Sequence, residues 1–347
     1  MTPKAALLYC LKVVGIFALC RMLTRRRLRI LCYHGMSVDD LHDYNPMLFM
    51  RPATFERRMT LLKKLRYPVV SLEEGIARLK EGRIHAGETV ITIDDGWQST
   101  KTMAAPILKR HDLPATVYVT TYYCEKETEV FNVALKYVLW RSDARYVTIE
   151  GVHPKVDGTY RFEEDFRAVA DAIIQRAEVH LDASSRQQLL EHVAQALQAC
   201  PFQALLDGRF KLMTRTEVGE LSEAGLDVQM HTHRHRMPMA DYQGVVREIN
   251  ENRDRLEEWT GKAPHHFCYP SGQYGANHPA WLTELGVQSS TTCEPGLNDD
   301  QTDRHRLRRF LDSEDFPDIV FEAELAGVGE LLRALKRIVA PMRTARP

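Results

Sequence analysis

The sequence lacks the cysteine pattern of a disulfide framework or a zinc ribbon. Its seven cysteines are odd in number and scattered, and they include no Cys-x-x-Cys pair. They are Cys10, Cys20, Cys32, Cys124, Cys200, Cys268 and Cys293. Disulfide-stabilised secreted proteins usually carry an even number of cysteines, whereas cytosolic proteins keep their thiols reduced. We therefore expect a reducing compartment and a cytoplasmic protein.

The sequence also lacks an excess of charge of either sign. Its 46 Lys and Arg residues nearly balance its 47 Asp and Glu residues, so the formal net charge is −1. This balance gives no argument for a nucleic-acid partner, and we expect none. The apolar fraction of 44% and the charged fraction of 27% are those of a soluble globular protein. A chain of 347 residues can hold one large α/β domain with insertions, or two ordinary domains.

The apolar stretch near the N-terminus is too short to span a bilayer comfortably. Residues 5–20 are mostly apolar but contain Lys12. Arginines follow this stretch instead of preceding it, which is the wrong order for a secretory signal peptide. We expect residues 1–27 to form an amphipathic helix and a basic stretch. This segment either packs on the domain or lies on a membrane surface with its arginines against anionic lipid.

Short β-branched strands alternate with helical patterns through much of the chain, which predicts parallel strands joined by helical crossovers and an α/β fold. The alternation breaks at about residues 125–213, where we predict a mostly helical insertion. An insertion of this size either shapes a binding surface or lid, or only decorates the domain. Residues 321–347 are expected to form a C-terminal helix and a basic tail.

Two adjacent carboxylates end one of the predicted strands. The run Thr89–Ile93 is apolar and β-branched, and Asp94, Asp95 and Gly96 follow it at once. Burying two neighbouring carboxylates is costly unless a cation binds them or one stays protonated. The pattern indicates a metal or proton-transfer site, although Asp and Gly are also ordinary turn residues.

Other chemically active residues also follow predicted strands. His231, His233 and His235 come directly after one strand, while His34 and Ser271 each follow another. Because the carboxyl ends of parallel strands converge on one face, we expect these residues to meet Asp94 and Asp95 there. Two imidazoles four residues apart plus a carboxylate are a common ligand set for catalytic zinc or a similar metal.

Three of these segments resemble the first three motifs of the polysaccharide deacetylase family, which includes chitooligosaccharide and peptidoglycan deacetylases. The segments are residues 92–96, 231–235 and 269–272, with the sequences TIDDG, HTHRH and YPSG. The resemblance covers about residues 28–320, with the helical insertion outside it. It implies a distorted (β/α) barrel and a mononuclear divalent metal, commonly Zn²⁺.

The resemblance also implies roles for individual residues. Asp95, His231 and His235 would bind the metal, and Asp94 would act as the general base on a metal-activated water. A backbone amide near Ser271 would help to stabilise the oxyanion. The implied activity is hydrolysis of the acetamide group of an N-acetylated sugar.

The sequence departs from the family's usual third motif. Where many members have Arg-Pro-Pro-Tyr-Gly, this chain has Cys268-Tyr269-Pro270-Ser271-Gly272, so the arginine that would hold the catalytic Asp is absent. Arg309, in the last predicted strand, is our candidate replacement. The late Leu-x-His motif also has no clear match. Members with Tyr-Pro in the third motif typically have Tyr-His near the first strand, as Tyr33-His34 does here, and we predict His34 as the general acid. A structural histidine is the alternative.

Several aromatic residues near the predicted strand ends are candidates for stacking on a sugar ring. They are Trp97, Tyr269 and Tyr122, together with its neighbour Tyr123. Aromatic residues at such positions also serve as core packing.

The sequence therefore predicts a metal-dependent enzyme that removes an N-acetyl group from a polysaccharide, an oligosaccharide or a glycan precursor, including a lipid-linked one. Two alternatives stay open: removal of another acyl group, such as formyl or O-acetyl, and glycan binding without catalysis.

Overall fold

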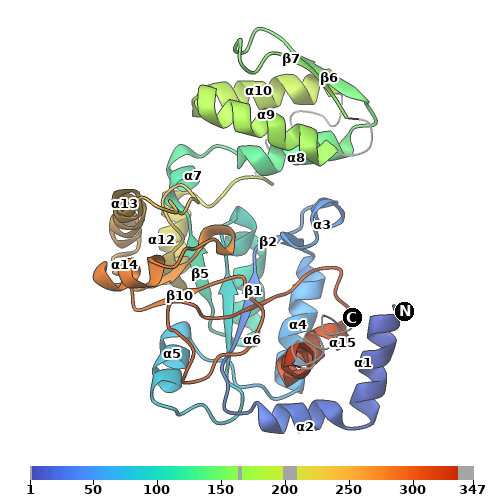
Figure 1. Ribbon diagram of the computed structural model, residues 1–347, viewed down its shortest axis with the longest axis vertical. Helices are drawn as coiled ribbons and strands as arrows, with labels where there is room; N and C mark the ends of the chain where they lie inside the picture. The colour runs from blue at the N-terminus through green and yellow to red at the C-terminus, as the bar shows by residue number, and fades with distance from the viewer. Residues whose placement is uncertain (1, 163–165, 198–208, 335–347) are drawn as a thin grey trace, which may run out of the picture. The chain divides into compact units, whose positions relative to one another are not determined.

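The structure, a computed structural model, describes residues 2–162, 166–197 and 209–334. The chain forms two compact units (Figure 1). Unit 1 comprises Met1–Thr121 and Thr216–Pro347, and unit 2 comprises Tyr122–Arg215. Unit 2 is thus a single insertion whose ends lie within a few residues of the segment predicted at 125–213.

Unit 1 is built on a seven-stranded parallel sheet with the order β10-β9-β8-β5-β4-β1-β11. The strands are β1 Arg29–Tyr33, β4 Thr89–Ile93, β5 Thr116–Val119, β8 Asp227–Met230, β9 His266–Cys268, β10 Ser289–Thr291 and β11 Phe310–Leu311. Every residue of β1 and β4 is buried, as expected of strands covered on both faces. The sheet curls into a half-barrel, and a bridge between Thr291 and Leu307 extends it beyond β10. The predicted fold class is confirmed.

Helices cover the outside of the curled sheet (Figure 1). They are α4 Pro52–Lys64, α5 Leu72–Lys80, α6 Ala105–His111, α12 Arg215–Glu223, α13 Tyr242–Thr260, α14 His278–Glu284 and α15 Asp318–Ala326. A π-helix, Thr100–Ala104, precedes α6. The smaller elements are α3 Leu41–Tyr44 and the paired strands β2 Gly35–Met36 and β3 Phe49–Met50.

Strand register decides which side chains meet at the end of the sheet. In the β1–β4 pair Tyr33 lies opposite Ile93, so the two strands end level with each other. The residues that follow them, His34 and Asp94, are therefore brought together from 60 positions apart in the sequence.

The N-terminal segment forms two helices where we expected one. They are α1 Pro3–Val13 and α2 Ile16–Leu23, separated by Gly15 with φ +83°. Glycine adopts this left-handed conformation without a steric penalty, so the chain can turn there. No single helix among the described residues has the length and apolarity to cross a membrane. The α1–α2 pair would pass by length and composition together, but it is bent by 78°.

The C-terminal helical prediction began too late. Helix α15 starts at Asp318 and ends at Ala326, and the following Gly327, with φ +82°, caps it. Residues 328–334 are helical again, and the rest of the predicted tail lies outside the described residues.

Within its described residues, 122–162, 166–197 and 209–215, unit 2 contains three long helices and a hairpin. The helices are α8 Phe131–Arg141, α9 Phe166–His180 and α10 Ala183–Leu197, preceded by the short α7 Thr121–Lys126. The hairpin pairs β6 Tyr146–Ile149 with β7 Gly158–Arg161 in antiparallel register. A bridge between Glu129 and Lys211 joins the segments where the chain enters and leaves the unit.

Candidate metal and catalytic site

Asp95, His231 and His235 form a cluster at the carboxyl ends of β4 and β8. Oδ1 of Asp95 lies 3.3 Å from Nε2 of His231 and 3.3 Å from Nε2 of His235. One potential ligand atom from each residue lies within 4.8 Å of the other two. The chain reaches this geometry by sharp turns after the strands, since Asp95 has φ +72° and His235 has φ +54°. These are the three residues for which the sequence predicts metal binding.

The hydrogen bonds around the cluster, like its donor atoms, are those expected of a metal site. Nδ1 of His231 lies 2.8 Å from the carbonyl oxygen of Cys268, which leaves Nε2 to face the cluster. Nε1 of Trp97 donates a 2.8 Å hydrogen bond to Oδ2 of Asp95, so Oδ1 is the oxygen left for a ligand. Such hydrogen bonds fix the orientation of metal ligands in metalloenzymes. One carboxylate and two imidazoles suit Zn²⁺ or a similar divalent transition metal.

Trp97 therefore does not have the role predicted from the sequence. Its side chain is only 2% exposed and packs edge-on against Phe49, with ring centroids 5.1 Å apart. A buried ring cannot stack on a sugar, so the substrate-binding prediction was wrong. The indole instead orients Asp95.

Asp94 faces a different partner from its neighbour. The Arg309 guanidinium donates two hydrogen bonds of 2.7 Å, one to each carboxylate oxygen of Asp94. Arg309 itself is fully buried, and its Nε donates to the carbonyl oxygen of Thr292. Burial disfavours the ionised form of Asp94, but Arg309 outweighs this, with smaller contributions from His231 and His34, and lowers the Asp94 pKa to about 2. Arg309 thus occupies the position that the sequence predicts for the missing arginine's substitute.

Two cysteines complete the surroundings of Asp94. The Sγ atoms of Cys32 and Cys268 lie 3.6 and 3.4 Å from its Oδ2. Burial raises the pKa of both thiols well above the usual range, so both remain protonated. Cys268 stands where many family members have arginine, and Nη2 of Arg309 lies 3.1 Å from its sulfur. The small side chain leaves room for a guanidinium that arrives from the other end of the sheet. Neither cysteine was predicted from the sequence to have a role, although each lies near the end of a buried strand.

His34 lies beside Asp94 at the end of β1. Its Nε2 is 4.0 Å from Oδ2 of Asp94, and its side chain is 18% exposed. Nδ1 is buried and has no hydrogen-bond partner among the described residues. The imidazole is thus close to the Asp94 carboxylate without a hydrogen bond to it.

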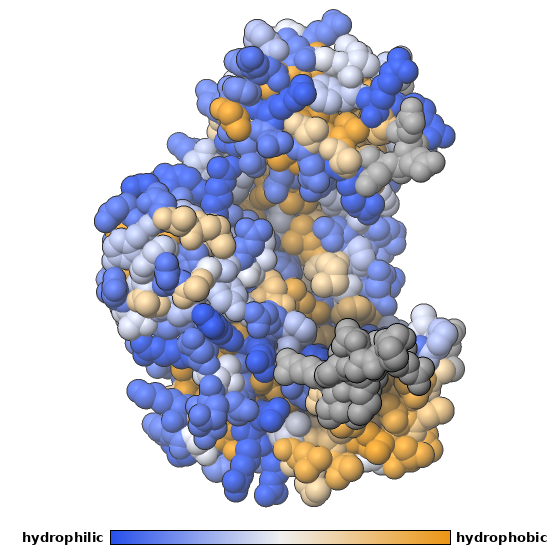
Figure 2. Space-filling model, in the orientation of Figure 1, coloured by the Kyte–Doolittle hydropathy of each residue, from blue (hydrophilic) through white to orange (hydrophobic). Residues whose placement is uncertain are grey.

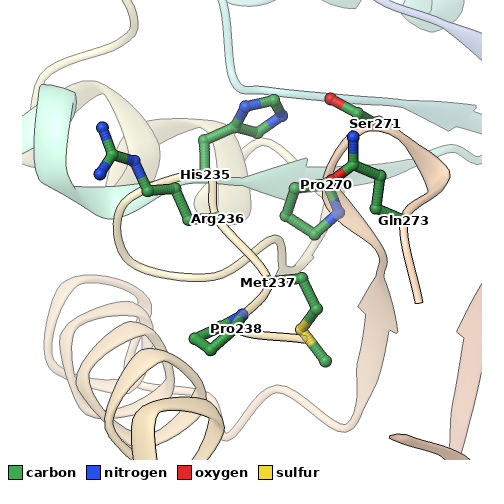
Figure 3. Close-up of a pocket in the computed structure, with 7 residues that line it drawn as sticks. All are labelled: His235, Arg236, Met237, Pro238, Pro270, Ser271 and Gln273. Atoms are coloured by element: carbon green, nitrogen blue, oxygen red, sulfur yellow. The ribbon is translucent and has the colours of Figure 1, made fainter. Parts of the chain in front are cut away.

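Ser271 lines an open cavity next to the cluster. The cavity has a volume of about 360 Å³ and is lined by His235, Arg236, Met237, Pro238, Pro270, Ser271 and Gln273. Figure 3 shows the Ser271 hydroxyl on the side of this cavity that faces His235. Ser271 has φ +53° and Gly272 has φ +66°, and a Cβ at Gly272 would approach Cys293 to 2.6 Å. The tight turn therefore requires glycine there, and it sets the direction of the neighbouring backbone amides.

Tyr269 and Tyr122 are the other two aromatic residues predicted to contact the substrate. Tyr269 is fully buried and stacks on Tyr274 with ring centroids 4.9 Å apart, so its predicted contact with substrate was wrong. Tyr122 belongs to unit 2, where it is half-buried and packs edge-on against Tyr123. It is not among the residues of unit 1 that form the cluster. His233 points away from the cluster, with Nδ1 2.9 Å from the Thr121 hydroxyl.

Comparison with known proteins gives three findings. The family model described as polysaccharide deacetylase matches residues 82–148 and 182–290. No curated protein sequence matches the chain. Solved structures with a similar fold include the Streptococcus pyogenes deacetylase PplD in complex with acetate, with 17% identity and a TM-score of 0.56 over 85% of this chain and 97% of that chain.

Two further solved structures are similar at this level. IcaB from Ammonifex degensii has 15% identity and a TM-score of 0.53, covering 87% of this chain and 97% of its own. A de-N-acetylase from Aggregatibacter actinomycetemcomitans has 14% identity and a TM-score of 0.53, covering 85% of this chain and 98% of its own. At these identities the likeness concerns the fold.

Proposed function

Because this chain belongs to the polysaccharide deacetylase family, we propose that it is a metal-dependent hydrolase that removes the N-acetyl group from an N-acetylated sugar. The observation that carries the proposal is that two adjacent carboxylates at the end of β4 have different surroundings. Asp95 joins two histidines in a ligand-like cluster, and Asp94 beside it is held ionised by Arg309.

Asp95, His231 and His235 would hold the metal, most suitably Zn²⁺. A divalent ion bound there would supply an acidified water and a Lewis acid for the acyl carbonyl. The protein's contribution to that site is orientation, through the hydrogen bonds from Trp97 to Asp95 and from His231 to the Cys268 carbonyl.

The remaining residues move protons. Water adds its oxygen to the carbonyl carbon of the acetamide, and Asp94 accepts the proton that the water loses. The carbon–nitrogen bond then breaks, and His34 supplies the proton with which the sugar amine leaves. The products are acetate and a free amine. The backbone amides of the Ser271–Gly272 turn are the candidates for stabilising the negative charge on the carbonyl oxygen.

Asp94 favours catalysis over glycan binding alone. A binding protein has no need for a second ionised carboxylate beside the ligand cluster, least of all one buried with its own arginine. The acetate in the PplD structure is the expected product of the proposed reaction, which supports acetyl over formyl as the acyl group. A polysaccharide, an oligosaccharide or a glycan precursor, including a lipid-linked one, remains the proposed substrate, and the cytoplasm remains the proposed compartment.

The proposal is tested by measuring acetate release from N-acetylglucosamine oligomers by purified protein. We expect release that stops with a chelator and returns with added Zn²⁺. Asp94→Asn should lower the rate by about 10²-fold or more while metal binding persists, because it removes only the base. Asp95→Ala should lose both acetate release and metal binding. Acetate release that is unaffected by the chelator, or full activity of Asp95→Ala, would rule out the mechanism.

A panel of N-formyl and O-acetyl saccharides separates the alternative acyl groups. Faster hydrolysis of either than of the N-acetyl compound would reassign the substrate. If metal and glycan both bind but no acyl group is released from any saccharide, the glycan-binding alternative holds.

A further inference from the structure

The N-terminal helices expose an unusual amount of apolar surface. Of the twelve large apolar side chains that are exposed in the described part of the chain, seven lie in α1, in α2 and at the corner between them. They are Leu7, Tyr9, Val13, Val14, Leu19, Met22 and Leu23, and we call this set the N-terminal patch. Val13 is 86% exposed, while Val14 and Leu23 are each 70% exposed. Figure 2 shows hydrophobic residues gathered over these helices at the lower right.

The opposite face of the two helices is firmly packed on unit 1. Leu8 and Phe17 are buried in a cluster with Ile319, Val320 and Ala323 of α15. Lys12 pairs with Glu322 on the same helix. The helices are therefore a fixed part of unit 1, and the patch is the side that faces away from it. Because one face is already occupied and the pair is bent by 78°, these helices are suited to lie along a surface.

Positive charge without a protein partner adjoins the patch. Arg25 and Arg26 directly follow α2, are exposed, and form no ion pair with any residue between 2 and 334 that the structure describes. Arg21 donates to the backbone oxygens of Leu65 and Arg66, which places the exposed Arg66 beside α2 as well. The nearby acidic side chains of Asp299 and Glu330 both lie close to Arg27 and not to Arg25 or Arg26. The positive charge of Arg25 and Arg26 is therefore available to an external partner.

We propose that unit 1 docks onto an anionic phospholipid surface through the N-terminal patch, with α1 and α2 lying in the plane of the interface. Aliphatic side chains would enter the boundary between headgroups and acyl chains, and Arg25, Arg26 and Arg66 would meet the phosphates. Exposed apolar patches on soluble proteins mark interaction sites, and a free basic border selects an anionic partner.

The docking leaves the catalytic site accessible. Helix α2 leads into β1 at the end of the sheet where the strands begin, whereas the catalytic residues follow the strand ends. A glycan would therefore enter from the side of unit 1 away from the contact made by α2. The proposal does not depend on the deacetylase activity, and its test does not measure that activity.

The test is flotation of the full chain with vesicles of phosphatidylcholine alone, or of phosphatidylcholine mixed with the anionic lipid phosphatidylglycerol. We expect flotation with the anionic vesicles that weakens as salt is raised. The double variant Val13→Gln/Leu23→Gln should reduce the partition coefficient by roughly tenfold or more. Arg25→Gln/Arg26→Gln should reduce it by about fivefold for each arginine, on anionic vesicles only.

Val179→Gln is the matched control, because Val179 is 72% exposed but lies on α9 in unit 2. It should float like the unchanged protein. Absence of flotation, or equal flotation of Val13→Gln/Leu23→Gln, would overturn the proposal. So would a dimer in lipid-free solution that this double variant dissociates, because the patch would then join two copies. Flotation that appears only after deletion of residues 335–347 would overturn it too, since the chain's own tail would cover the patch.

Discussion

Asp94 and Asp95 are neighbours in sequence, yet their carboxylates have different surroundings. Asp95 faces two imidazoles and the indole of Trp97, whereas Asp94 faces a guanidinium and two thiols. Both are ionised, but only Asp94 has its charge fully paired by a protein cation. The metal would complete the pairing of Asp95. The role of each carboxylate can be tested by substituting the residue that holds it, which is Arg309 for Asp94 and Trp97 for Asp95.

Arg309→Met should destabilise the protein because it leaves the Asp94 charge buried without a partner. Removing one member of a buried ion pair typically costs about 3–5 kcal/mol. We expect a loss of this size in the free energy of unfolding, measured with urea at pH 7. Adding Asp94→Asn to Arg309→Met should recover part of the loss, because the unpaired charge is then gone. Equal stability of Arg309→Met and the unchanged protein would show that the pair is not buried as described.

Trp97→Phe should weaken metal binding without disrupting the fold. The variant loses the 2.8 Å hydrogen bond to Asp95 but keeps an aromatic ring against Phe49. Loss of a hydrogen bond that orients a metal ligand typically costs about 10–100-fold in affinity. Competition for Zn²⁺ with a chromophoric chelator measures the effect. The matched control, Phe49→Leu, disturbs the same ring contact and should lower stability while leaving the affinity nearly unchanged. Identical affinities of Trp97→Phe and the parent would contradict the positioning role.

At the scale of elements, the sequence pattern located strands better than it located individual side chains. The strand predicted at Thr89–Ile93 agrees with β4 residue for residue, because a β-branched apolar run between polar turns has few other interpretations. The orientation of Trp97 could not be read in the same way. It depends on the turn at Asp95 and Gly96, with φ +72° and +88°, which rotates the indole back under Asp95.

The packing of β10 against the segment that leads to β11 gives a pH-dependent contribution to stability. His305 is buried between the hydroxyls of Ser290 and Thr283, each 3.0 Å from a ring nitrogen. Burial, with a smaller effect from Arg304, lowers its pKa to about 4. The unfolded chain binds a proton near pH 6.5 and the native chain does not, so the free energy of unfolding rises with pH between 4 and 6.5. This contribution is complete above pH 6.5 and is lost as the pH falls towards 4.

His305→Gln should remove that dependence. Urea unfolding at pH 4.5 and pH 7, with chelator present, should show a fall in stability at low pH for the parent protein. The variant should show a smaller fall, by up to about 3 kcal/mol. Parallel stability profiles of the two proteins would mean that His305 is already protonated in the native state.

At the scale of the whole molecule, the alternation of strands and helices and the point where it stops were both visible in the sequence. The pairing of Arg309 with Asp94 was less accessible, because 215 positions separate them. It requires the late strand β11 to pair with β1, which lies between β11 and β4 in the sheet. Arg309 could be named as a candidate from its place in the last predicted strand. The two hydrogen bonds from Arg309 to Asp94, and the two cysteines that leave room for the guanidinium, depend on how distant strands pair in the sheet. Local sequence patterns do not encode that pairing.

The division into two units predicts how metal binding affects unfolding. All the metal-binding candidates lie in unit 1, whereas unit 2 has a core of its own that includes Leu135, Val138, Ile173 and Val193. A ligand that binds only the folded form stabilises it by about 2.7 kcal/mol at a concentration of 100 Kd. Calorimetry should therefore show two transitions, and added Zn²⁺ should raise the temperature of only one. Asp95→Ala should abolish that shift and leave the other transition in place. A single transition that moves as a whole would show that the units unfold together.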